Sequence, residues 1–190
     1  MKKLLLIAGG FLLLAAAISG VWATLATNRQ QTTQVIEADG SDWASGPALQ
    51  YLTQQSELII TGRCLGTHSI WIGRELFTAA TIEVGKTIKG DSSSRLTVNF
   101  PGGVDIERKV PVRMSYPDAP SIHTGENVLL FAKQTPDGYA LTGFDGKFSI
   151  VNDRGQTMVS RDPARASLQG GTPRAVPLAE LEGRIRQYLQ

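Results

Sequence analysis

Cysteine and histidine are nearly missing from this chain of 190 residues, which contains one cysteine and two histidines. Because Cys64 has no second cysteine to pair with, no disulfide can form within the chain, although small exported domains often depend on such bonds. Zinc sites take three or four ligands at short spacings, and neither an HExxH motif nor paired CxxC motifs occur. We therefore expect no metal site and no cofactor.

An excess of charge of one sign is also missing. The 19 basic and 17 acidic residues leave a formal net charge of +2, and Lys2 and Lys3 account for the whole excess. Proteins that bind polyphosphate backbones gather Lys and Arg on one surface, whereas here bases and acids are interleaved along the chain. We expect no nucleic-acid partner.

Motifs that carry chemistry are not found either. There is no GxSxG nucleophile elbow, and the glycine pairs at 102–103 and 170–171 lack the lysine and the helix of a phosphate loop. We assign no catalytic, metal-ligating or cofactor-binding residue, and the binding residues stay unknown. Cys64 lies in an apolar stretch and is expected to be a small buried side chain, with a reactive thiol or an intermolecular bridge as the alternative.

The N-terminus carries the most specific signal that is present. Lys2 and Lys3 precede an apolar run over residues 4–23, which is the layout of a secretory signal. A run of about 20 apolar residues is also long enough to span a bilayer, so residues 1–23 are either a cleaved signal peptide or a retained membrane anchor. In both cases the rest of the chain is exported, to the periplasm or the extracellular space. Residues 24–46 are polar and are expected to form a flexible spacer.

Residues 47–160 are expected to form one β-rich domain. A short helix begins at Pro47, and a strand over residues 58–72 is expected to bend at Gly62 or Gly66, because glycine within a strand often marks a bulge. Residues 76–84 and 96–100 alternate apolar and polar side chains, which predicts a central hairpin that ends at the Pro-Gly-Gly of residues 101–103.

The second half of this domain continues the strand pattern. Residues 104–114 alternate apolar and charged side chains around Pro111, which predicts an exposed or edge strand. Residues 127–132 are apolar on both faces and are expected to lie centrally, packed on two sides. The turns at residues 135–138 and 152–155 predict two further hairpins.

The C-terminal part is divided into a flexible linker over residues 161–176 and an amphipathic helix over residues 177–190. Leu178, Leu181 and Ile185 fall near helical spacing, and charged residues, Glu182 among them, are expected on the opposite face. We expect this helix to close the domain's own core, with a partner or a membrane surface as the alternative.

Several of these strand and turn segments together resemble a family of small exported bacterial β-proteins of uncharacterised function. The resemblance covers residues 47–190 and lies in residues 57–63, 77–90, 98–103, 125–131 and 146–148. More distantly, the strand that ends in Ile88-Lys89-Gly90 is similar to the netrin-like module of the tissue inhibitors of metalloproteinases. That resemblance implies a five-stranded Greek-key barrel of the oligonucleotide-binding type. With the two helices expected from the sequence pattern, the predicted fold is a small, mainly antiparallel β-barrel with a short N-terminal helix and a C-terminal amphipathic helix. The inhibitors act through an N-terminal cysteine pair that this chain lacks, so inhibition is not carried over.

Two functional classes stay open. The first is a non-enzymatic binding module of the bacterial envelope or extracellular space, in which a barrel face or the proline-rich loop of residues 115–124 contacts a protein or a glycan, with a membrane tether through the N-terminal apolar segment as a further option. The second is an envelope hydrolase or a metal-assisted accessory enzyme that uses His68 or His123 with nearby carboxylates. Histidines and carboxylates gathered in one pocket would favour the enzyme.

The mass of the exported protein distinguishes a cleaved signal from a retained anchor. The small residues near the end of the apolar run favour cleavage after Ala23 or Ala26, so the mature chain is expected to start at Thr24 or Thr27. Intact-mass spectrometry of the exported chain checks this. A full-length mass would establish the anchor instead.

Overall fold

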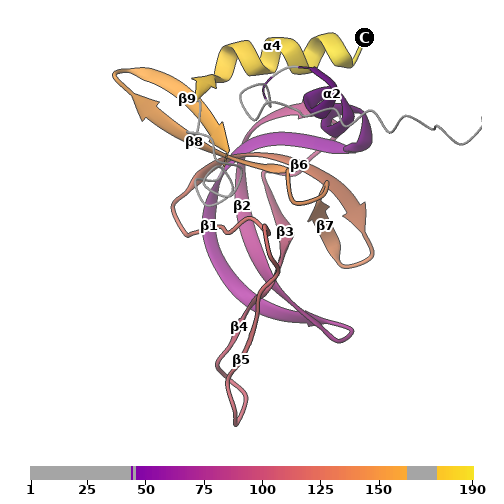
Figure 1. Ribbon diagram of the computed structural model, residues 1–190, viewed down its shortest axis with the longest axis vertical. Helices are drawn as coiled ribbons and strands as arrows, with labels where there is room; N and C mark the ends of the chain where they lie inside the picture. The colour runs from indigo at the N-terminus through magenta and orange to yellow at the C-terminus, as the bar shows by residue number, and fades with distance from the viewer. Residues whose placement is uncertain (1–43, 45, 162–174) are drawn as a thin grey trace, which may run out of the picture. The chain divides into compact units, whose positions relative to one another are not determined.

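The computed structural model describes residue 44, residues 46–161 and residues 175–190, all within a compact unit that spans Ala38–Gln190. The predicted signal peptide, nearly all of the spacer and most of the 161–176 linker lie outside the described residues. The elements, in chain order, are α2 (Gly46–Gln55), β1 (Leu58–Ile72), β2 (Glu75–Lys89), β3 (Arg95–Pro101), β4 (Gly103–Asp105), β5 (Val112–Met114), β6 (Asn127–Thr135), β7 (Gly138–Leu141), β8 (Lys147–Asp153), β9 (Gln156–Arg161), β10 (Val176–Pro177) and α4 (Leu178–Tyr188) (Figure 1).

Five strands form a ring. The order β1-β2-β3-β7-β6 returns to β1, because β1 pairs with both β2 and β6. All neighbours in the ring are antiparallel except β3 and β7, which run parallel. The β6–β7 hairpin places β7 between β3 and β6, so the chain crosses over between β3 and β6 in a Greek-key connection. The predicted Greek-key barrel of the oligonucleotide-binding type, with its two flanking helices, is therefore confirmed.

Strand β1 bends so that it can serve two neighbours. Its pairing with β2 shifts register at three places, between Ile59 and Ile60, between Thr61 and Gly62 and between Cys64 and Gly66, and the last two lie at the glycines where the sequence predicts a bend. At Gly62 the strands approach so closely that a Cβ would lie 2.5 Å from the carbonyl oxygen of Glu83. Only glycine fits at this position without a backbone shift.

Strand β6 separates two apolar layers. Val128, Leu130 and Ala132 point into the ring, where they pack with buried side chains of β1, β2 and β3. Leu129 and Phe131 point to the other face and contact a second cluster that includes residues of both helices. The prediction that residues 127–132 are packed on two sides is confirmed.

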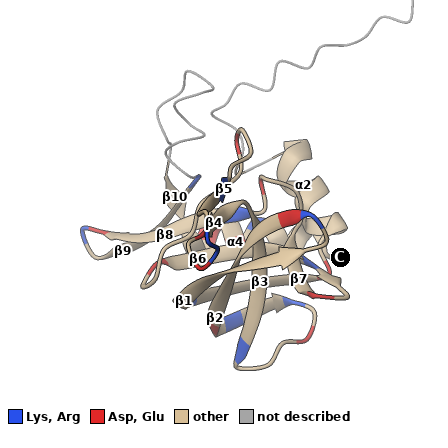
Figure 2. Ribbon diagram, turned by 90° about the horizontal axis from the view of Figure 1, so that it is seen from below, with Lys and Arg blue, Asp and Glu red and all other residues tan. Residues whose placement is uncertain are grey.

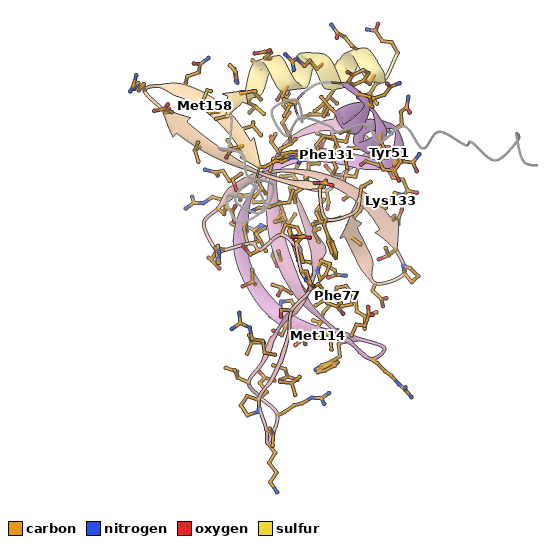
Figure 3. All side chains as sticks on the ribbon, in the orientation of Figure 1. Tyr51, Phe77, Met114, Phe131, Lys133 and Met158 are labelled. Atoms are coloured by element: carbon orange, nitrogen blue, oxygen red, sulfur yellow. The ribbon has the colours of Figure 1, made fainter. Side chains whose placement is uncertain are left out.

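The second layer consists of α2, α4 and the outer faces of β6, β8 and β9. Leu49 and Leu52 of α2 and Leu181 and Ile185 of α4 are buried in it. Figure 3 shows Phe131 beneath the two helices, and its ring meets Phe148 of β8 edge to face, with the centroids 5.6 Å apart. The C-terminal helix thus closes the domain's own core, as expected.

One residue of α4 departs from the prediction. Glu182 was expected on the polar face, yet its side chain is only 9% exposed and forms an ion pair with Lys86 of β2. Arg186, one turn further along the helix, lies 3.5 Å from the same carboxylate. The ion pair fixes α4 to β2 of the ring. The helical pattern alone cannot predict the burial of Glu182, because its partner Lys86 is distant in the sequence.

The prediction for residues 104–114 is confirmed in that the segment is exposed and lies at a sheet edge, but wrong in making it one strand. The segment instead forms two short strands, β4 and β5, which pair only with each other. They project away from the ring as a finger (Figure 1). The chain leaves the β4 ladder after Asp105, whose carboxylate accepts a hydrogen bond from the backbone N–H of Glu107, so the strand turns instead of continuing.

Replacing Gly62 tests the close approach of β1 and β2. We expect Gly62→Ala to lower the free energy of unfolding by about 1–3 kcal/mol, because the added methyl group overpacks a backbone contact. Gly66→Ala in the same strand is the control, since a Cβ there meets no atom within 4 Å. Urea denaturation of both variants measures the difference. Equal stability of the two variants would contradict the account.

Candidate binding surface

The β4–β5 finger, residues 103–114, exposes apolar side chains that the rest of the domain buries. Ile106 is 74% exposed and Val110 is 72% exposed, the highest values among the large apolar side chains of the described residues. Val104 adds a third, at 45%. Single exposed apolar residues are ordinary, but a group of them on one projecting element makes that element a candidate contact site.

The register of the finger divides it into two faces. Val104 lies opposite Arg113, and both point to solvent, while Asp105 lies opposite Val112 and both are partly covered. Ile106 follows just after the end of β4 and is likewise exposed. The outer face therefore combines apolar side chains with a basic one, and the inner face turns toward the β1–β2 hairpin.

Polar contacts hold the inner face in place. The indole Nε1 of Trp71, near the end of β1, donates a hydrogen bond of 2.7 Å to Oδ2 of Asp105. Arg108 donates to the same oxygen at 3.1 Å, and its guanidinium carbon lies 4.2 Å from the centre of the Trp71 ring. Such a cation–π contact adds to the ion pair. The inner face is thus held through Asp105, and the side chains of Ile106 and Val110 take no part in these contacts.

The base of the finger is held by the same hairpin. Ser69 donates to the carbonyl of Val104 at 2.7 Å, and Thr78 donates to the carbonyl of Gly102 at 2.9 Å. The backbone N–H of Leu76 points at the sulfur of Met114 at 3.4 Å, and Figure 3 shows Met114 at this end of the ring. An isolated two-stranded hairpin is only marginally stable in water, so these contacts account for its order.

A shallow groove of about 400 Å³ lies elsewhere, on the outer side of β1 and β2. Its lining includes Arg63, Glu83, Asn127, Ile150 and Leu178. The volume is within the range of small-molecule sites, but the groove holds only one carboxylate and one cation and no nucleophile paired with a base. Neither histidine lines it.

The histidines are not brought together with carboxylates in this groove. His68 is exposed on β1, and His123 is exposed in the loop before β6, where its backbone N–H donates to Glu126. Among the residues that the structure describes, no three His, Cys, Asp or Glu side chains are placed to share a metal ion. The enzyme alternative thus gains no geometric support.

A buried lysine beside a serine has the composition of a nucleophilic dyad. Lys147 lies 2.5 Å from Glu126 and donates to Ser149 at 3.2 Å, and the hydroxyl of Ser149 donates to Glu126 at 2.8 Å. A lysine base would have to accept the serine proton, whereas this serine gives it to a carboxylate. The arrangement is that of an ion pair which fastens the loop before β6 to β8.

Cys64 is fully buried, as expected from its apolar surroundings. Burial raises the pKa of its thiol, which keeps the thiolate fraction low at neutral pH.

The proline-rich loop of residues 115–124, a predicted contact site, is partly structural, because its Ile122 packs into the ring interior.

Basic and acidic side chains are interleaved over the described part of the chain (Figure 2). The absence of a nucleic-acid partner stays a prediction.

Within the described ranges, no helix has the length and apolar character needed to cross a bilayer.

Sequence reasoning missed the finger, although a signal for it was present. The apolar residues 104, 106, 110 and 112 lie in a short segment that also contains Pro111 and five charged residues. These residues make the segment unsuitable as a strand of the core. Apolar side chains in a segment unsuited to the core are candidates for an exposed contact surface.

Comparison with known proteins assigns no family, because neither the protein-family models nor the curated protein sequences give a match to this chain.

The pKa of Asp105 tests how the finger is fixed. The hydrogen bond from Trp71 lowers this pKa below the ordinary value of 3.8, with further lowering by Arg108. A depressed folded-state pKa means that the attachment is complete above the ordinary value and is lost as the pH falls through the lower, folded-state value. We expect the NMR signal of the Trp71 indole N–H to shift with a midpoint below pH 3.8.

Asp105→Asn is the control for this titration, since the amide has no charge to lose in this pH range. The shift should vanish in that variant. A midpoint at or above the ordinary aspartate value, or an unchanged titration in Asp105→Asn, would show that the carboxylate does not hold the finger.

Proposed function

We propose that this chain is an exported, non-enzymatic binding module of the bacterial envelope or extracellular space, and that the β4–β5 finger is its contact surface. The observation that supports this proposal is that different residues of the finger attach it to the barrel and face the solvent. Asp105, Trp71 and Arg108 fix it to the barrel, while Ile106 and Val110 are left in water.

Exposure of this kind costs free energy unless something covers it. Burying one exposed valine or isoleucine side chain is worth about 1.5–3 kcal/mol. The domain nevertheless leaves Ile106 and Val110 exposed, while it buries other valine and isoleucine side chains in its two cores. An apolar element that is attached by several hydrogen bonds has less freedom to lose on binding than a free loop, so it is well suited to a contact surface.

The export of the chain rests on its N-terminal residues 1–23, and its bacterial origin on the resemblance to small exported β-proteins. The fold is compatible with a binding role, because barrels of the oligonucleotide-binding type serve widely as binding modules. A fold does not by itself name a ligand. The kind of partner is therefore inferred from the exposed side chains of the finger. Because these are apolar, the partner is expected to offer an apolar surface rather than the hydroxyl groups of a glycan.

Photo-crosslinking in cells tests this function. A photoreactive amino acid at position 107, between the two exposed apolar residues, is expected to give an adduct with an envelope component when the full chain is exported by a bacterial host. The same group at position 153, near the β8–β9 turn, is the control, because that turn carries no apolar cluster. Equal labelling at both positions would argue against a specific contact at the finger.

The apolar side chains themselves are tested by Ile106→Ser combined with Val110→Ser. We expect this double variant to lose the adduct at position 107 by roughly a hundredfold, since each buried side chain contributes about one factor of ten. Tyr51→Ser with Val151→Ser is the matched control, because those residues are also exposed, at 62% and 47%, but lie outside the finger. Undiminished adduct in the finger variant would overturn the proposed function.

A further inference from the structure

The charge of the finger is unevenly distributed. Residues 103–114 contain two acids, Asp105 and Glu107, and three bases, Arg108, Lys109 and Arg113. Asp105 is already neutralised by Arg108 within the finger. The remaining charged residues are one acid, Glu107, and two bases, Lys109 and Arg113. The part of the finger that can meet a partner therefore carries a small net positive charge beside its apolar residues.

The placement of these groups matches that of elements that enter a membrane surface. Ile106 and Val110 stand at the far end of the finger, and Lys109 lies between them in the sequence, while Arg113 is on the outer face next to Val104. Lys and Arg have long apolar stems with a charged end, which lets them lie beside inserted side chains and reach the headgroups. Anionic headgroups attract such residues.

The shape of the finger suits a lipid surface. The finger is a narrow projecting hairpin (Figure 1), and its Ile106 and Val110 are exposed, so a protein partner would need a hollow already shaped to receive them. A bilayer interface yields to any such projection. The predicted N-terminal segment, with Lys2 and Lys3 ahead of an apolar run, would also bring the chain to a membrane, whether it is cleaved there or retained.

We propose that the tip of the β4–β5 finger inserts into the surface of a membrane that contains anionic phospholipid, with Ile106 and Val110 entering the acyl boundary and Lys109 and Arg113 contacting the headgroups. This inference rests on the proposed function, of which it names the partner. This contact lies at the opposite side of the ring from the two helices (Figure 1).

Spin labelling of the finger tests the insertion. The full chain with Glu107→Cys and a nitroxide label is reconstituted with vesicles of phosphatidylcholine alone, or with equal parts of phosphatidylcholine and phosphatidylglycerol. The native Cys64 is buried and is not expected to react. Any retained N-terminal anchor holds the chain on both kinds of vesicle, so only the environment of the label differs between them.

We expect the label to become more accessible to oxygen and less accessible to a water-soluble nickel complex on the anionic vesicles, and to stay aqueous on phosphatidylcholine alone. A label at Asp153→Cys should stay aqueous on both. Adding Ile106→Ser and Val110→Ser should return the label at position 107 to its aqueous values, whereas Tyr51→Ser with Val151→Ser should leave it inserted.

The basic residues are tested by charge reversal. Lys109→Glu should reduce the inserted fraction on anionic vesicles by on the order of tenfold. Arg154→Glu, in the β8–β9 turn, alters the net charge by the same amount and should have no such effect. Equal losses in both variants would mean that overall charge, and not the finger, governs the contact.

The outcomes separate this inference from the proposed function. A label that stays aqueous on anionic vesicles, together with a protein adduct at position 107 in cells, would overturn membrane insertion and leave the binding function in place. An aqueous label and no adduct above the control would overturn both. Insertion that is equally deep without Ile106 and Val110 would also overturn the inference.

Discussion

The pairing of β1 with two neighbours at once is the constraint on which the rest of the structure depends. Residues 58–63 of β1 pair with β6 on one edge and with β2 on the other, which closes the ring. A strand can do this only if it curves, and its register with β2 shifts at Gly62 and Gly66 as well as between Ile59 and Ile60. Closure in turn gives β6 an inner and an outer apolar face. The inner face fills the ring, and the outer face makes α2 and α4 necessary, since without them Leu129 and Phe131 would be exposed to water.

The finger follows from the same strand. Beyond Gly66, β1 pairs only with β2, and the two strands continue as a hairpin past the ring. This extension supplies Ser69, Trp71 and Thr78, the side chains that hold β4 and β5. A contact element that stands away from a closed barrel needs such a support, because two short strands cannot hold their own geometry. The position of the proposed contact surface is thus a consequence of how the barrel is closed.

Most of the fold could be predicted from local patterns, whereas the candidate site depends on contacts between distant residues. The alternation in β2 and β3, the two apolar faces of β6, and the helix at 177–190 are periodic signals, and each matches the structure. The division of residues 104–114 into a finger depends on the bond between Asp105 and Trp71, which are 34 positions apart. The burial of Glu182 likewise depends on Lys86. A single sequence does not reveal such partners, so the acidic residue was assigned to solvent and the segment to an edge strand. The resemblance to exported β-proteins stays a prediction that neither the fold nor the comparisons test.

The central claim is that the domain contacts its partner through a rigid finger and not through the groove on β1 and β2. Amide hydrogen exchange of the full chain, measured free and bound to bacterial envelope vesicles, tests this most directly, because it reports on every backbone segment in one experiment. The account predicts that exchange slows on binding within residues 104–113 and is unchanged in β8, β9 and the strands that line the groove. Slowing at Arg63, Glu83 and Asn127, with the finger unchanged, would contradict it.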